Sequence, residues 1–196
     1  TLASGDTEEV VALAGTETWY WRVIATDDAG NTRAAQADSM LLVDTTPPAA
    51  FVRLSPASGF ETSAASIAFR WTTSSDPQSG LVSYRLQVST ASTFDSSIFA
   101  DTTLAAADTE EIVALYGSET WYWRVIASDD AGNTTASGPT ADSILIVDTA
   151  APTAFGLVSP AQGTETSATS VRFEWGASSD PQSGIGSYRL LVSTAP

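Results

Sequence analysis

The sequence contains no cysteine, no histidine and no lysine, and each absence removes a class of chemistry. Without cysteine there is no disulfide, no zinc–thiolate site and no thiol nucleophile. Without histidine, the commonest general base and metal ligand is missing. Without lysine there is no Schiff base, no P-loop and no Lys–Asn isopeptide crosslink. Long apolar runs are also absent, and none approaches the ~18 residues that a membrane-spanning helix needs.

The charge balance is strongly one-sided. Arginine supplies all eight basic residues against 23 acidic ones, which gives a formal net charge of −15 over 196 residues. Such a surface repels nucleic acid and anionic membranes, so we expect no nucleic-acid partner and no membrane insertion. Cations are favoured partners, and an acidic surface without lysine fits an extracellular or cell-surface setting.

The sequence repeats itself with a period of about a hundred residues. Residues 1–32 match residues 103–134 at 26 of 32 positions, and residues 51–91 match residues 155–195 at 27 of 41. A unit of this length is the size of one β-sandwich domain. The repeat frame predicts three parts: a C-terminal half domain at 1–46, a complete repeat at 47–148, and an N-terminal half domain at 149–196.

Alternating apolar and polar residues predict strands and no helix. In SIAFRW, for example, Ile67, Phe69 and Trp71 share one face of the strand. The predicted fold is all-β, with seven short strands in a complete repeat. The seven strands of the complete repeat are AFVRLSP, SIAFRW, SYRLQVS, a weak SSIFAD, EEIVAL, WYWRVIAS and SILIVD.

The order and spacing of these strands resemble fibronectin type III domains and related bacterial Ig-like repeats, and the resemblance implies tandem Ig-like, seven-stranded sandwiches. The residues that carry the resemblance are Trp71 and Trp175 in the second strand, the segment SGLVSYRLQVS, and the penultimate strand LYGSETWYWRVIASDDAGN. In that family a Leu stands six residues before a Tyr of the penultimate strand. Here Leu115 stands six before Trp121, so the resemblance implies that an indole N–H would have to replace the Tyr hydroxyl bond.

Tryptophan is the most conspicuous residue of the repeat, and we predict that it forms the core. A sandwich without disulfides needs large apolar side chains between its sheets, and Trp121 and Trp123 alternate with Val125 and Ala127 on one strand face. Carbohydrate stacking would need exposed rings and is the weaker reading. The predicted core tryptophans are Trp19, Trp21, Trp71, Trp121, Trp123 and Trp175.

Acidic residues gather in the loops at one end of the predicted sandwich. The B–C loop SSDPQSG, the F–G loop DDAGNT and the linker VDTTPP all reach that end in this topology. Calcium takes six to eight oxygen ligands, mainly carboxylates and carbonyls, so an interdomain structural Ca²⁺ is one hypothesis. The other is that Asp, Asn and Gly serve only as turn formers. The candidate ligands are Asp44, Asp76, Asp129 and Asp130, with Asp148 and Asp180 at the next junction.

The sequence starts in the middle of one repeat unit and stops in the middle of another, and this leads to a further expectation. No secretory leader is recognisable and the chain does not start with Met, so we expect an internal segment of something longer, or a processed product. A half sandwich cannot cover its inner face alone, so the flanks of a longer array, or the complementary half of another copy, would complete it. The two repeats lack ten residues, corresponding to 93–102, which favours either a periodic filament or a register-cut array over a random truncation, and of these two we expect the filament.

These observations favour a structural role: a repeat segment of an extracellular fibre, stalk or sheath that assembles end to end with copies of itself. The alternative is an adhesin or a carbohydrate-binding accessory module, with glycans as partners. An enzyme is not expected, because no carboxylate pair or metal-ligand spacing supports one. Asn133-Thr134-Thr135 is a single N-glycosylation sequon, which matters only in a secreted context.

Overall fold

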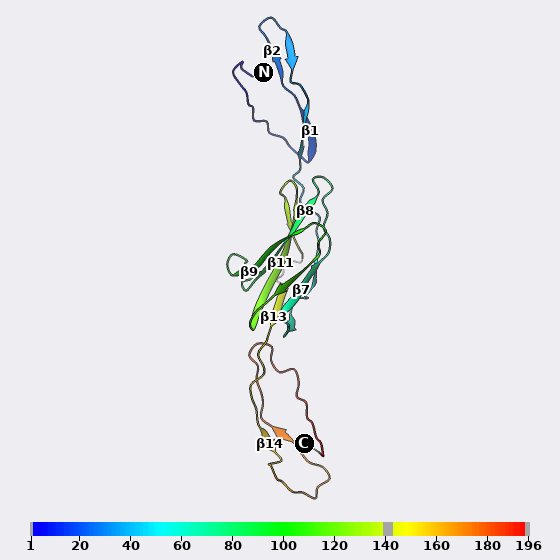
Figure 1. Ribbon diagram of the computed structural model, residues 1–196, viewed down its shortest axis with the longest axis vertical. Coiled ribbons are helices and arrows are strands. Elements are labelled where there is room, and N and C mark those ends of the chain that lie inside the picture. Colours follow the sequence, from blue (N-terminus) through cyan, green and yellow to red (C-terminus); the bar gives the residue numbers. More distant parts are fainter. Residues whose placement is uncertain (1, 139–142, 195–196) are drawn as a thin grey trace.

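The computed structural model describes residues 2–138 and 143–194, and this part of the chain is all-β. Figure 1 shows a central domain with one open segment projecting from each end of it. We call residues 2–46 the N-terminal segment and residues 149–194 the C-terminal segment. They lie at opposite ends of the long axis of the molecule (Figure 1). Within the described residues, no helix long and apolar enough to span a membrane is found.

The central domain is an Ig-like sandwich of two sheets. The smaller sheet has the strand order β10 (Glu110–Ala114), β7 (Ser66–Trp71), β5 (Arg53–Ser55). The larger sheet has the order β6 (Phe60–Thr62), β13 (Ser143–Val147), β11 (Glu119–Asp129), β8 (Leu81–Ser89), β9 (Ile98–Ala105), with β12 (Thr134–Ala136) also paired to β11. Every pair is antiparallel except β6 with β13.

All seven predicted strands form in this domain, and two further short strands, β6 and β12, lie outside the predicted ranges. The first strand pairs with β7 as β5 and then crosses to the other sheet, where β6 runs parallel to β13. The break falls directly after Ser55, because Pro56 has no N–H to donate to a ladder. The sequence pattern did not reveal the β6 pairing, since FET carries no alternation.

The core lies between the two sheets and follows the predicted alternation. Along β11 every second residue is buried, from Trp121 to Asp129, while the residues between them are partly exposed. Inward residues of β7 and β8 face them, so apolar side chains from three strands fill one layer. The largest side chains that are less than 2% exposed are Trp71, Trp123, Tyr84, Phe69, Leu86 and Leu115.

Trp121 stands where the family resemblance implies a tyrosine. Its indole Nε1 is buried and has no hydrogen-bond partner among the described residues, so the N–H does not replace the tyrosine hydroxyl bond. Its ring instead packs edge to face against Phe99, with centroids 5.0 Å apart. Packing therefore substitutes for the missing polar contact at this corner.

The outer face of the larger sheet carries a ladder of polar side chains. Arg85 donates to Asp101, with Nε–Oδ1 at 2.6 Å, and the Gln87 amide donates to the other oxygen of Asp101 at 3.1 Å. Arg124 donates to Gln87 at 2.8 Å and lies 4.4 Å above the ring of Phe94. Gln87 lies on this outer face and is nevertheless almost fully covered, because it is hydrogen-bonded to both Arg124 and Asp101.

The two terminal segments contain only short strand pairs. In the N-terminal segment β1 (Glu17–Trp21) pairs with β4 (Ser39–Val43), and β2 (Ile24–Thr26) pairs with β3 (Thr32–Ala34). In the C-terminal segment β14 (Leu157–Ser159) pairs with β15 (Glu174–Trp175). By sequence, these strands are the counterparts of parts of β11, β13, β12, β5 and β7.

Strands whose ladder partner is missing do not form in these segments. Residues 8–12 repeat β10 and residues 185–193 repeat β8, yet neither range is strand. A strand persists through its hydrogen-bonded neighbours and packed face, and here those neighbours are not present. For the same reason Trp21, predicted as core, is 59% exposed, and Trp19 and Trp175 are only partly buried.

Candidate metal centre

The linker that enters the central domain runs between two loops and is fastened to both. On one side Ala49 N–H donates to the Ser75 carbonyl at 2.8 Å, and Ser74 Oγ donates to the Ala49 carbonyl at 2.5 Å. On the other side Thr135 Oγ1 donates to the Pro48 carbonyl at 2.6 Å. These bonds hold the linker in one path, and they place its first acidic residue between the loops.

Asp44 connects the two sides of the junction. Its Oδ1 accepts from the Thr46 N–H at 2.8 Å and from Thr16 Oγ1, in the N-terminal segment, at 3.4 Å. Its Oδ2 accepts from Ser79 Oγ, in the B–C loop of the central domain, at 2.6 Å. These hydrogen bonds, that of Ser79 Oγ foremost, lower the pKa of Asp44 below its usual value, so the carboxylate is ionised at neutral pH.

Asp76 is the acidic residue of the B–C loop. Its Oδ1 accepts from the backbone N–H groups of Gln78 and Ser79, both at 2.9 Å, and of Gly80 at 3.1 Å. The loop itself is tied to the core, because Ser74 N–H donates to the hydroxyl of Tyr84 at 2.5 Å. The other oxygen of Asp76, Oδ2, is buried and has no hydrogen-bond partner among the described residues. A buried carboxylate oxygen without a partner is costly, and it is the atom here that needs a ligand.

Asp129 ends β11 and begins the F–G loop. Its Oδ1 accepts from the Asn133 N–H at 2.7 Å and its Oδ2 from the Asn133 amide at 2.9 Å. The same amide nitrogen donates to the carbonyls of Asp44 at 3.1 Å and Thr46 at 3.4 Å. Asn133 therefore clamps the F–G loop to the linker, and it fixes Asp129 beside Asp44.

The three carboxylates converge at this point. Asp44, Asp76 and Asp129 each offer an oxygen, and these oxygens lie within 4.8 Å of one another. Oxygens on opposite sides of a calcium ion, each about 2.3–2.6 Å from it, are separated by about that distance. All three residues are at least nine-tenths buried, with Asp76 9% and Asp129 4% exposed. Each pair of charges at this separation repels by about 3–4 kcal/mol at an effective dielectric near 20.

The other predicted ligands lie elsewhere. Asp130 lies in the turn that follows β11, is exposed, and is not one of the three converging acids. Asp148 and Asp180 meet at the second junction, where Ser183 Oγ donates to Asp148 Oδ2 at 2.7 Å and Ser183 N–H donates to Asp180 Oδ1 at 2.9 Å. This second site repeats Asp44, Asp76 and Ser79 but has no F–G loop in place.

The sequence predicted the acidic residues of the site but not the residues that hold them in place. Ser79 and Ser183 bridge linker and B–C loop at the two junctions, and the repeated DPQSG was the available signal. The sequence indicated Asn133 as a turn former of the F–G loop and as a glycosylation site, and not as a clamp between that loop and the linker. In the folded structure its amide nitrogen, which carries two hydrogens, lies within hydrogen-bond distance of three acceptors, so a glycan on it would have to displace the clamp. Glycosylation of Asn133 stays a prediction.

Comparisons with known proteins add little to this picture. No protein-family model matches the chain, and no curated protein sequence matches it. Among solved structures, a crystal structure of the chicken CNTN1 FN1-FN3 domains is similar, with 15% sequence identity and a TM-score of 0.35. The match covers 72% of this chain and 48% of that one, so the chain spans about half the length of that structure. At this TM-score the likeness carries no functional argument.

Proposed function

We propose that this protein is a structural repeat segment of an extracellular fibre, stalk or sheath, in which calcium bound at the domain junction fixes successive Ig-like domains end to end. The observation that carries the proposal is the convergence of Asp44, Asp76 and Asp129, one from the linker and one from each loop, together with the buried and unpartnered Oδ2 of Asp76. An ion there would tie the linker to both loops and offset the repulsion among the three carboxylates.

The arrangement of the chain supports a spacer role. The linker is held by hydrogen bonds on both sides, and the parts of the chain lie one after another along the long axis (Figure 1). Thr16 also donates to Asp44 from the N-terminal segment, so the junction couples neighbouring units. A junction that resists bending turns a string of domains into a rod, whereas a free linker would leave it flexible.

Calcium is the ion that this donor set suits best. The three side chains supply only carboxylate oxygens, and the clamp adds backbone carbonyls close by, a combination that hard cations prefer. Magnesium needs near-ideal octahedral geometry and retains its water, which suits it less well. Extracellular calcium modules bind with dissociation constants of about 0.1–1 mM, which matches an extracellular setting for a chain of net charge −15.

The experiment is a thermal melt of the 196-residue chain in calcium, in magnesium and in EDTA. With a dissociation constant of about 0.1 mM, 1 mM calcium stabilises the folded domain by about 1.4 kcal/mol. For a domain of about a hundred residues this raises the melting midpoint by about 5–10 °C. Small-angle scattering in the same buffers should show a longer and less flexible particle with calcium. Identical midpoints and identical scattering in calcium and EDTA would refute the proposal.

A second function, glycan binding, has one observation in its favour. Phe99 and Tyr116 form an exposed edge-to-face pair on the central domain, with centroids 5.8 Å apart. Exposed aromatic rings are the surfaces on which sugars stack. Binding of the chain to a glycan array, lost in Tyr116→Ala, would favour an adhesin or accessory module over a spacer.

A further inference from the structure

A strand near the start of the central domain lies beside its last strand, and the two run in the same direction. β6 pairs in parallel with β13, from Phe60 opposite Leu145 to Thr62 opposite Val147. Every other strand pair described in this domain is antiparallel. The chain enters the domain a few residues before β6 and leaves it directly after β13, so these two strands are the ones that tension on the chain reaches first.

Hydrogen bonds extend this pairing beyond both ends of β6. Before the strand, the Gly59 N–H donates to the Ile144 carbonyl at 2.7 Å. After it, the Asp148 N–H donates to the Thr62 carbonyl at 2.9 Å. We call the β6–β13 pairing together with these two bonds the shear contact. It reaches from the loop before β6 to Asp148, the residue at which the chain leaves the domain.

The chain is also held between the linker and β6. On the side of the smaller sheet, the Val52 carbonyl accepts from the Thr72 N–H, just after β7, at 2.9 Å. On the side of the larger sheet, the Phe51 carbonyl accepts from the Gly138 N–H at 2.9 Å. Together with the linker bonds described above, these contacts distribute tension from the linker over both sheets.

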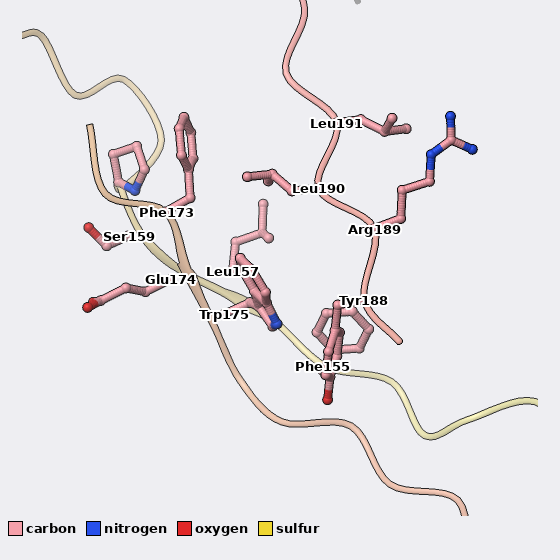
Figure 2. Close-up of a pocket in the computed structure, with 11 residues that line it drawn as sticks. Phe155, Leu157, Ser159, Phe173, Glu174, Trp175, Tyr188, Arg189, Leu190 and Leu191 are labelled. Carbon is pink, nitrogen blue, oxygen red and sulfur yellow. The ribbon is translucent and has the colours of Figure 1, made fainter. Parts of the chain in front are cut away.

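The path of the chain up to this point recurs in the C-terminal segment. β14 pairs with β15 as β5 pairs with β7, and Figure 2 shows the paired residues Leu157 and Trp175 next to each other. β5 ends at Ser55 and β14 at Ser159, and a proline follows each of them. The end of the first strand, from which the chain crosses to β6 in the central domain, is therefore a property of the repeat unit.

The parallel direction decides how the shear contact is loaded. The linker and the exit at Asp148 lie toward opposite ends of the long axis (Figure 1). Tension along that axis pulls β6 back toward the linker and pulls β13 forward toward its exit. Because the two strands run in the same direction, they are drawn past each other and the bonds between them are strained together. Strands that are pulled apart sideways lose their bonds one after another, which needs less force.

We propose that the shear contact between β6 and β13 bears load, and that it keeps the central domain folded while tension acts along the long axis of the molecule. The source of the tension rests on the proposed function, because units of a fibre or stalk pull on one another through their linkers. The shear contact itself does not rest on calcium, since neither β6 nor β13 contributes one of the three converging carboxylates.

The experiment pulls one protein along two axes in single-molecule force spectroscopy. The chain has no cysteine, so introduced cysteines define unique attachment points. The double variant Glu61→Cys, Thr103→Cys places them on β6 and β9, the two edge strands of the larger sheet, at exposed positions. The same double variant carries handles at its two termini for pulling along the long axis. Both directions therefore act on a protein of the same stability.

At equal constant force, the domain pulled from its termini should stay folded at least about tenfold longer than the domain pulled across the sheet. Tenfold in lifetime corresponds to about 1.4 kcal/mol of additional barrier, which is the scale of one or two hydrogen bonds that must fail together with the others. Equal lifetimes in the two directions, or a longer lifetime across the sheet, would overturn the proposal.

A pair of substitutions in β6 locates the load. Glu61→Pro removes an N–H from β6 and fixes its φ, so it should shorten the lifetime along the long axis at least about fivefold. Glu61→Ala changes the same side chain but keeps the N–H, and its lifetime should equal that of the wild type. Equal lifetimes of the two variants would show that the load does not pass through β6.

Calcium separates this proposal from the proposed function. The difference between the two pulling directions should persist in EDTA, because the shear contact lies outside the carboxylate cluster. A chain whose melt ignores calcium but which keeps the directional difference refutes only the calcium junction. A chain whose melt responds to calcium but which unfolds equally fast in both directions refutes only the load-bearing contact.

Discussion

The rings of Phe69 and Trp123 meet edge to face with their centroids 5.1 Å apart, and this contact joins the two sheets of the central domain. Phe69 belongs to β7 in the smaller sheet and Trp123 to β11 in the larger one. Arg53 also contacts Trp123: its guanidinium lies 5.5 Å from the centre of the Trp123 ring and donates a hydrogen bond to the Trp123 carbonyl at 2.8 Å. With no disulfide in the chain, aromatic packing of this kind holds the sandwich together.

Trp123→Ala should therefore destabilise the central domain by about 3–5 kcal/mol, since it removes a fully buried ring and leaves a cavity between the sheets. Chemical denaturation followed by tyrosine and tryptophan fluorescence measures the loss. Tyr122→Ala, on the outer face of the same strand, is the matched control and should cost less than half as much. Equal losses would show that the inner face is not the main source of stability.

The metal centre predicts that the calcium response depends on a buried acid of the cluster and not on an exposed acid outside it. Asp76→Asn should abolish the rise in melting midpoint on addition of calcium, because it removes charge from the buried oxygen that lacks a partner. Asp130→Asn removes the same charge from an exposed residue outside the cluster and should leave the calcium response unchanged. Calcium titration of the two variants by calorimetry makes the comparison. A response lost in both, or kept in both, contradicts the assignment of Asp76.

The hydroxyl of Tyr84 should matter to the metal centre although it lies in the core. It accepts the Ser74 N–H and thereby fixes the B–C loop that carries Asp76. Tyr84→Phe keeps the ring but leaves that N–H without its acceptor, so we expect a loss of about 1–2 kcal/mol in the free energy of unfolding. Calcium affinity should fall together with stability. An unchanged affinity in a destabilised variant would show that the loop is fixed by other contacts.

Acid should remove the contribution of Asp101 in a defined range of pH. Its hydrogen bonds from Arg85, followed by that from Gln87, lower the pKa of Asp101 below its ordinary value of 3.8. A carboxylate whose pKa is lower in the folded state stabilises the fold above the unfolded-state pKa. That contribution is lost as the pH falls through the folded-state pKa. Asp101→Asn should therefore cost about 0.5–1 kcal/mol at pH 7, given the partial exposure of the pair, and nothing below both pKa values.

The measurement is urea denaturation of wild type and Asp101→Asn at a series of pH values from neutral to strongly acidic. The difference between the two should be constant down to about pH 4 and then shrink to zero. Asp108→Asn serves as the control, since it lies outside the polar ladder of the larger sheet and should show little difference at any pH. A difference for Asp101 that grows as the pH falls would contradict the sign of the pKa shift.

The candidate site was predictable from sequence in part. The loops that carry Asp76 and Asp129 come together because the topology of the sandwich places them at one end, and topology could be read from strand order. Asp130 could not be separated from Asp129 in this way, since only the exact end of β11 decides which side chain turns inward. The Asn133 clamp was hidden as well, because it depends on a linker carbonyl 89 positions away in sequence.

The sequence by itself determined the all-β class, the repeat of about a hundred residues and the inner face of each strand, because a period of two and turn residues are local properties. Only the tertiary structure decided which faces are buried. The segment TWYWRVI occurs identically at residues 18–24 and 120–126, yet Trp21 is 59% exposed while Trp123 is 1% exposed. The physical reason is that a side chain is buried by the strands that pack against its face, and such strands cover Trp123 but not Trp21.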